Sequence, residues 1–177
     1  MGDWAELTKV DPDLTFVPLW RAVERWLREN DPARGSGLRS GATAEDVSTV
    51  ERLIGAALPA SIRFAYMRHN GEEHNSFGLF GGKRWLPLLQ VVEFWQGWQR
   101  QFADIQPPQG RRRTRSARSR TQDQTWNSLR VPFSYDWGRG YHCVDLQPVD
   151  GGVRGQIVMF DFATEAVVAP NFEEWLA

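Results

Sequence analysis

The segment with the most chemistry-bearing side chains is residues 134–146, SYDWGRGYHCVDL. It holds the only cysteine of the chain, Cys143, with His142 beside it, Asp145 two positions later, and Gly138 and Gly140 upstream. A cysteine close to a base is the pattern of a nucleophilic enzyme, and closely spaced glycines can cradle a phosphate. The same segment also fits a strand that enters a protein core.

The alternation of residue types favours the strand. In an extended chain successive side chains point to opposite faces, so Tyr141, Cys143 and Asp145 share one face while His142 and Val144 share the other. Neighbouring His142 and Cys143 therefore cannot pair as base and nucleophile within one strand. We expect Asp145, at the strand end, to accept backbone hydrogen bonds from the following QPVDGG turn, with a place in a binding surface as the alternative.

An enzyme that uses Cys143 would need His69 or His74 from elsewhere in the chain. A lone cysteine in a strand is more often a small buried hydrophobe, and we expect that here. Gly138 and Gly140 join two strands, whereas a phosphate loop leads from a strand into a helix. The glycines therefore predict a tight turn.

The segment HNGEEH gathers polar side chains that could ligate a metal: His69, Glu72, Glu73 and His74. Their spacing matches no metal-binding motif, and a polar loop explains them as well. The chain has no HExxH, no nucleophile elbow and no paired catalytic carboxylates. The sequence therefore predicts no catalytic residue, no metal and no cofactor.

Composition predicts a folded domain in the cytoplasm. The chain has 177 residues, 41% of them hydrophobic, and nine tryptophans, which suits a single domain with a substantial core. Residues 1–9 do not resemble a secretory signal. No segment approaches the roughly 20 apolar residues that span a bilayer.

The basic residues are unevenly distributed. Six of the 21 arginines and lysines lie between Arg111 and Arg120, which leaves 15 basic against 22 acidic residues elsewhere. The surrounding segment, residues 106–125, is rich in proline, glycine and polar residues and predicts a flexible surface insertion. It lacks interleaved aromatic residues, so binding to nucleic acid is not expected.

Periodicity indicates helices followed by strands. Thr43 with Asp46, and Asn171 with Glu174, have the spacing of helix-capping pairs. Leu58-Pro59 interrupts the second helix, and Asn70-Gly71 suits a left-handed cap on the third. The pattern predicts an α+β fold, mainly an antiparallel sheet with helices packed on one face. The expected helices are residues 16–30, 43–57, 60–71, 88–105 and 171–177. We expect edge strands or a hairpin within residues 77–88. Four further strands are expected at residues 130–136, 141–146, 155–161 and 165–169.

The ordered set of segments resembles a known family. VERWL, the block GATAEDVSTVERLIGAALPASIRFAYMRHNG, WLPL, VPFSYDWGRGYHCVDLQP, GVRGQIVMFD and VVAPNFEEWL together resemble the Smi and Knr family of the SUKH superfamily. The resemblance runs from Phe16 to Leu176 and implies a domain over residues 16–177 after an extension of residues 1–15. Its most specific residues are Glu51, Leu58-Pro59, Asn70-Gly71, Gly138, Gly140, Asp145-Leu146, Phe172 and Trp175-Leu176.

The resemblance implies a non-enzymatic protein-binding domain. Bacterial members are immunity proteins that neutralise toxins, often nucleases, and fungal members regulate cell-wall assembly. The short chain is more similar to the bacterial form, so we expect a tight complex with a cognate toxin, by a chain that is a monomer or a weak dimer. A regulatory or scaffold module is the alternative, and a cysteine-dependent enzyme is a distant one.

An acidic body could pair with a basic toxin, and aromatic residues and arginine commonly anchor interfaces. We therefore expect partner contacts from seven residues that loops and strand ends could bring together. The alternative is that their side chains pack in the core or face solvent without a partner. The residues are Glu72, Glu73, His74, Trp85, Trp137, Arg139 and Tyr141.

Overall fold

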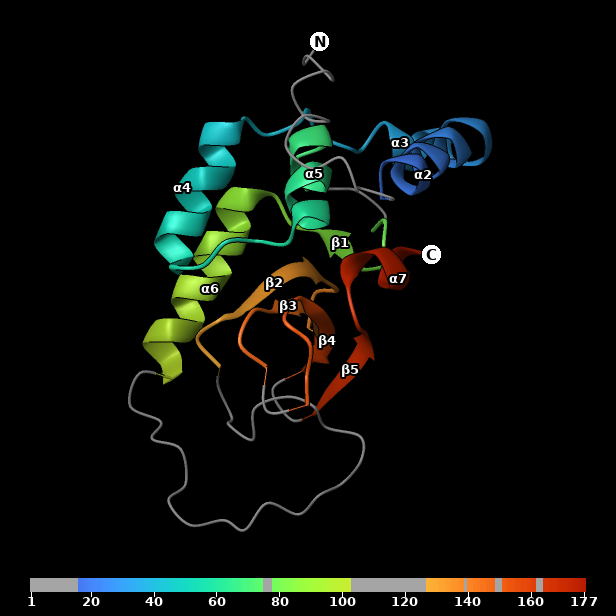
Figure 1. Cartoon of the computed structure of the whole chain (residues 1–177). Helices are drawn as coiled ribbons and strands as arrows, with labels where there is room; N and C mark the ends of the chain where they lie inside the picture. Colours follow the sequence, from blue (N-terminus) through green and yellow to red (C-terminus); the bar gives the residue numbers. More distant parts are fainter. Residues whose placement is uncertain (1–15, 75–77, 103–126, 139, 149–150, 162–163) are drawn as a thin grey trace.

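A computed structural model describes residues 16–74, 78–102, 127–138, 140–148, 151–161 and 164–177 (Figure 1). The predicted extension 1–15 and the whole of the predicted insertion 106–125 lie outside the described residues, as does Arg139. Among the helices described, none is long and apolar enough to cross a membrane. The elements are α2 (Phe16–Asn30), α3 (Pro32–Gly35), α4 (Ala44–Ile54), α5 (Ala60–Arg68), β1 (Arg84–Trp85), α6 (Leu88–Phe102), β2 (Arg130–Tyr135), β3 (Tyr141–Asp145), β4 (Gln156–Phe160), β5 (Glu165–Ala169) and α7 (Phe172–Leu176).

The strands form one five-stranded antiparallel sheet in the order β1-β2-β3-β4-β5. Each strand pairs with the next one along the chain. From β2 to β5 the strands follow one another directly, as antiparallel neighbours can, whereas α6 lies between β1 and β2 in the sequence. The two-residue strand β1 forms one edge, with Arg84 opposite Tyr135 and Trp85 opposite Ser134. The predicted α+β class with an antiparallel sheet is confirmed.

Helix α4 begins as predicted and ends earlier than predicted. Thr43 and Asp46 form a reciprocal capping box at its start. The helix ends at Ile54, where Gly55 takes the left-handed conformation with φ 79°, so the glycine and not Leu58-Pro59 terminates it. Glu51 then holds the chain after the helix, because its carboxylate accepts a hydrogen bond from the Leu58 backbone N–H at 2.8 Å.

Asn70-Gly71 does not cap α5, which ends at Arg68 with an extended His69. Instead, the Asn70 side-chain oxygen accepts a hydrogen bond from the Leu88 N–H, at 2.9 Å, at the start of α6. Gly71 has φ 73°, and a Cβ there would lie 2.5 Å from the Pro87 nitrogen. The pair therefore joins the end of one helix to the start of another.

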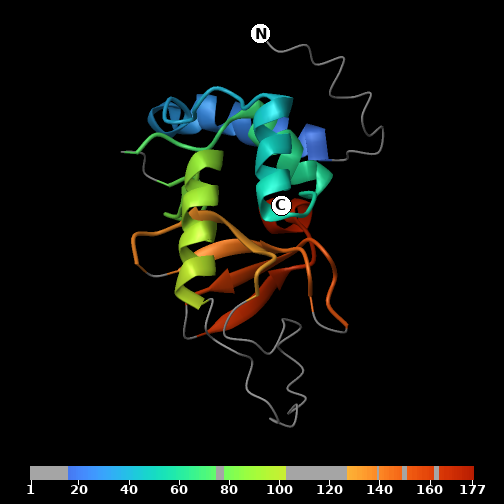
Figure 2. The same cartoon turned by 90° about the vertical axis from the view of Figure 1, so that its left-hand side faces the viewer.

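Apolar side chains are buried on both faces of the sheet. The larger cluster joins α2, α4, α5, α7 and the first half of α6 to residues such as Phe133, Val144 and Ile157. A smaller cluster on the Cys143 face packs Trp98 of α6 against Phe160. Figure 2 shows α6 running across the strands. The prediction of helices on one face is therefore incomplete, because the second half of α6 packs against the opposite face of the sheet.

A partly buried ionic contact joins α2 to the end of α5. The Glu24 carboxylate receives the Arg68 Nε at 2.5 Å and lies 2.8 Å from the His69 Nε2. Burial alone would raise the pKa of Glu24, but hydrogen bonds with His69 and Arg68 outweigh burial and lower this pKa to about 2. The ionised carboxylate therefore stabilises the fold.

Replacing Glu24 by glutamine should lower the free energy of unfolding by roughly 2 kcal/mol near neutral pH. The pKa of Glu24 is lower in the folded chain than in the unfolded chain. Its stabilisation is therefore fully present above the ordinary glutamate pKa of 4.5 and is lost as the pH falls toward about 2. Urea unfolding between about pH 7 and about pH 2 measures the effect. The exposed Glu29 of the same helix supplies the control variant, Glu29→Gln. An unchanged acid dependence in Glu24→Gln would contradict the assignment.

Candidate functional site

The residues predicted to contact a partner divide into two groups. Glu72, Trp85 and Tyr141 are buried, with exposed fractions of 0%, 1% and 7%, so their side chains do not offer a contact surface. Glu73, His74 and Trp137 are exposed.

Glu72 braces the chain around β1. Its carboxylate oxygen Oε2 accepts hydrogen bonds from the backbone N–H groups of Leu79, at 2.9 Å, and Trp85, at 2.6 Å. Its own backbone N–H donates to the Trp85 carbonyl at 2.9 Å. A buried carboxylate needs such donors because burial removes its water, so Glu72 is a structural residue.

Tyr141 is also structural. Its ring stacks on Tyr135 with centroids 4.7 Å apart and meets Trp98 edge-on at 4.7 Å. Burial raises the pKa of its phenol to about 12. The ring therefore remains neutral at physiological pH and contributes to the smaller apolar cluster.

Trp137 is the most distinctive of the exposed residues. It follows β2 in the turn to β3, it is 59% exposed, and its backbone is left-handed with φ 64°. A bulky residue rarely adopts this conformation, which costs about 1–3 kcal/mol. A large aromatic ring is thus held in solvent on a strained backbone.

Three neighbouring side chains fix the orientation of the Trp137 ring. The Arg84 guanidinium lies 5.2 Å from the ring centroid, within the range of a cation–π contact. The His74 ring meets Trp137 edge-on at 5.2 Å, and the Tyr135 ring lies at 5.9 Å. We call the exposed His74 and Trp137, together with the buried Arg84 that orients the ring, the Trp137 surface.

The strands position this surface. Arg84 is opposite Tyr135 in the ladder, and Lys83 forms an ion pair with Asp136, the residue before Trp137. Gly138, with φ 134°, allows the turn that follows. Sequence reasoning did not identify Arg84, Lys83 or Asp136 as site residues, because their roles depend on the pairing of β1 with β2 and no local motif signals that register.

His142 and Cys143 point to opposite faces, as predicted. The His142 ring contacts Trp175 at 4.9 Å and its Nδ1 hydrogen-bonds with the Ser134 hydroxyl at 2.9 Å. Cys143 is fully buried beside Trp98, and burial raises the pKa of its thiol. Such a thiol is a poor nucleophile.

Asp145 is buried within a polar network. It accepts a hydrogen bond from the Gln147 backbone N–H at 3.1 Å, which is the kind of contact expected of a residue that stabilises the following turn. It also accepts hydrogen bonds from the side chains of Asn127, at 3.1 Å, and Gln156, at 3.0 Å. The opposite residue, Arg130, pairs with Glu165 at 2.7 Å. Asp145 therefore holds the strand end and its turn together.

The polar residues of HNGEEH are dispersed. His69 contacts Glu24, Glu72 bonds to backbone groups, Glu73 lies 3.5 Å from Arg39 and His74 contacts Trp137. The part of the chain that the structure describes contains no group of three or more potential ligands that could hold a metal ion.

Adjacent Glu72 and Glu73 provide a matched test of these assignments. Glu72→Gln should lower the free energy of unfolding by about 1–3 kcal/mol, because it removes a charge-assisted acceptor and buries an amide in its place. Glu73→Gln should change it by less than about 0.5 kcal/mol, because this side chain faces solvent. Urea unfolding measures both, and equal effects would contradict the assignment.

Cys143 should resist modification in the folded protein. We expect a maleimide to label it at least about 100-fold more slowly in the native chain than in the urea-unfolded chain, because the thiol is inaccessible and stays protonated. Mass spectrometry reports the labelling without ambiguity, since Cys143 is the only cysteine. Rapid stoichiometric labelling of the native chain would revive the enzymatic alternative.

The family model described as the SMI1/KNR4 family (SUKH-1) matches residues 41–177. The glucan synthesis regulatory protein of Neurospora crassa is 24% identical over 193 residues, which cover 89% of this chain and 36% of that protein. The cell wall assembly regulator SMI1 of Saccharomyces cerevisiae is 24% identical over 192 residues, covering 89% and 38%.

A shorter similarity is to F-box only protein 3 of Mus musculus, which is 37% identical over 72 residues, 41% of this chain and 15% of that protein. The chain spans little more than a third of the length of the two fungal relatives, 36% and 38%. The family match, by contrast, covers most of the chain and contains every strand of the sheet. The chain therefore belongs to the SMI1/KNR4 family (SUKH-1).

Proposed function

We propose that this chain is a non-enzymatic interaction domain with a regulatory role, and that it binds a protein partner through the Trp137 surface. The observation that carries the proposal is Trp137 itself, exposed on a left-handed backbone. Strained residues that persist in a fold cluster at functional positions. The names of the fungal relatives, a regulator of glucan synthesis and a regulator of cell wall assembly, support a regulatory role.

The chemistry of the Trp137 surface suits an interface anchor. Tryptophan and arginine dominate the binding energy of protein interfaces. Here Arg84 is buried, at 4% exposed, and its guanidinium lies beside the Trp137 ring, so the ring is already oriented before a partner arrives. Such pre-organisation reduces the entropy that binding must offset.

Toxin neutralisation is the second candidate function. The sequence alone placed it ahead of a regulatory role, and we now reverse this ranking. The relatives that cover most of the chain are named as regulators. The charge argument for a basic toxin is also weak, because the whole chain carries 21 basic and 22 acidic side chains, a formal net charge of -1. Complementarity to a strongly basic partner would call for a larger excess of acid.

Replacing Trp137 by alanine should weaken partner binding by about 30-fold, equivalent to the loss of about 2 kcal/mol at an interface hot spot. The chain is purified with its bound proteins from its native host, and the affinity of the recovered complex is measured by titration. Thermal unfolding should be nearly unchanged, because Trp137 faces solvent.

The matched control is Leu89→Ala, which removes another exposed apolar side chain, 71% exposed on α6. It should leave the complex intact. Equal affinity of wild type and Trp137→Ala would refute the proposed surface. A partner that arrests growth when expressed alone, and is neutralised by this chain, would restore the toxin hypothesis.

A further inference from the structure

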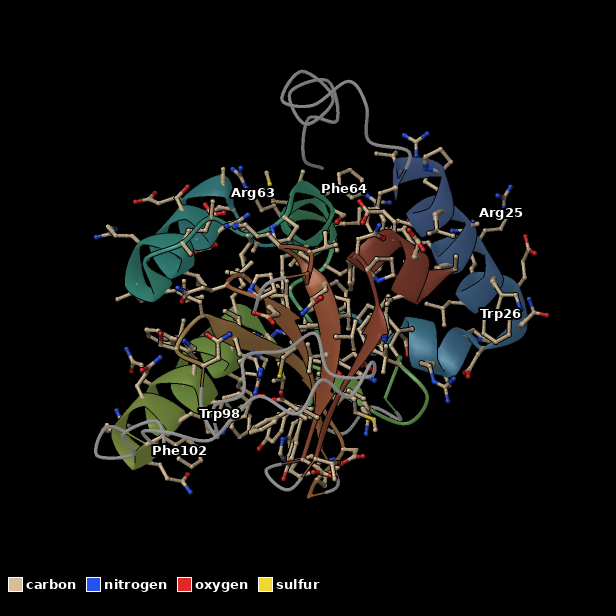
Figure 3. All side chains as sticks on the ribbon, turned by 60° about the horizontal axis from the view of Figure 1, so that its bottom comes forward. Arg25, Trp26, Arg63, Phe64, Trp98 and Phe102 are labelled. Atoms are coloured by element: carbon tan, nitrogen blue, oxygen red, sulfur yellow. The ribbon has the colours of Figure 1, made fainter. Side chains whose placement is uncertain are left out.

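The outer face of α2 carries a row of arginines. Arg21, Arg25 and Arg28 are all exposed. Because successive residues of a helix are about 100° apart, these three lie within about 60° of one another and along about 10 Å of the helix axis. Figure 3 shows Arg25 on the outer side of α2, directed away from the rest of the domain. We call Arg21, Arg25 and Arg28 the α2 stripe.

The α2 stripe has no acidic partner within the described part of the chain. None of its three guanidinium groups forms an ion pair or a side-chain hydrogen bond with a described residue. Glu24 of the same helix is held by Arg68, which leaves Glu29 as the exposed acid of α2. Positive charge therefore predominates along this face. By contrast, several basic side chains elsewhere lie within ion-pair distance of a carboxylate: Arg34, Arg39, Arg63, Arg68, Lys83 and Arg130.

The α2 stripe opposes the stability of the helix that carries it. Its members are four and three residues apart, and like charges at both spacings repel one another and weaken a helix. The helix is kept in place by side chains on its opposite face, which are buried in the domain: Phe16, Trp20 and Leu27. Carboxylates placed along the stripe would replace this repulsion with attraction.

The chemistry of the stripe favours carboxylates on a protein over other polyanions. Nucleic-acid binding draws its affinity from many phosphate contacts, and three arginines on a chain with a formal net charge of -1 supply few. A helix that lies on a membrane buries its apolar face in the bilayer, whereas the apolar face of α2 is buried in the domain. Arginine pairs with a carboxylate through two parallel hydrogen bonds.

We propose that the α2 stripe binds an acidic segment of a partner protein, whose carboxylates meet the three guanidinium groups. Exposed charges at an interface act mainly on the rate of association and on its salt dependence. The stripe would therefore guide the partner onto the domain. This inference rests on the proposed interaction role, but it does not depend on the Trp137 surface.

The test titrates the isotope-labelled full chain with two short peptides, one with glutamates and one with lysines three and four residues apart. In NMR spectra, the amide signals of residues 21–28 should shift saturably with the glutamate peptide and not with the lysine peptide. Replacing the whole stripe, by Arg21→Gln, Arg25→Gln and Arg28→Gln together, should weaken binding of the glutamate peptide about 10-fold, as the loss of three exposed ion pairs allows. Raising NaCl from about 50 mM to about 300 mM should also weaken wild-type binding several-fold.

The matched control removes the same amount of charge elsewhere, by Arg52→Gln, Arg100→Gln and Arg154→Gln together, since these arginines are also exposed. It should bind the glutamate peptide like the wild type. The variant without the stripe should unfold at the same or a higher urea concentration than the wild type, because like-charge repulsion is removed. Loss of binding is thereby separated from loss of the fold.

Equal weakening in both triple variants, saturable binding of the lysine peptide, or no saturable binding of the glutamate peptide would overturn the proposal. Tighter binding of a single-stranded oligonucleotide, or of phosphatidylserine vesicles, would overturn it in favour of another class of partner. Trp137→Ala should bind the glutamate peptide like the wild type, so failure of the α2 stripe and failure of the Trp137 surface are distinguishable. Loss of peptide binding in Trp137→Ala would place the acidic segment elsewhere and contradict the assignment.

Discussion

Burial of Trp85 is the constraint on which the rest of the structure depends. Its ring contacts Trp20 of α2 at 5.1 Å, Tyr66 of α5 at 5.2 Å and Phe80 at 5.9 Å, while Glu72 holds its backbone. One side chain thus joins two helices to the edge of the sheet. Because neighbours in a strand point to opposite faces, burying Trp85 in the larger cluster places Arg84 on the other side, where it orients Trp137. The exposed surface is therefore set from within the core.

The residues that identify the family serve the fold. Glu51 and Asn70 accept backbone hydrogen bonds, Gly71 permits a close approach to Pro87, and Asp145 organises a buried network. Removing such an acceptor leaves backbone N–H groups without their partner and lowers stability. Membership of the family thus concerns the scaffold, and the proposed partner site consists of other residues, on the surface of that scaffold.

Local rules predicted much of this architecture. Alternation along residues 141–145 placed His142 and Cys143 on opposite faces, and the spacing of Thr43 and Asp46 marked the start of α4, because both depend on neighbours in sequence. The burial of Glu72 depends on N–H groups at positions 79 and 85, which no local pattern reveals. Tertiary packing also decides which of the adjacent Trp26 and Leu27 is buried: Leu27 is covered beside Gly35 of α3, whereas Trp26 is 53% exposed.

The turn that carries Trp137 has a consequence for how such domains diversify. The ladder closes at Tyr135 opposite Tyr141, and the side chain beyond it is mostly in solvent, so an exchange at position 137 alters the presented chemistry while the paired strands keep their register. If partners bind the proposed Trp137 surface, mutations that change recognition there act on different contacts from the buried ones that hold the core. A lineage could then acquire a new partner without first rebuilding the interior.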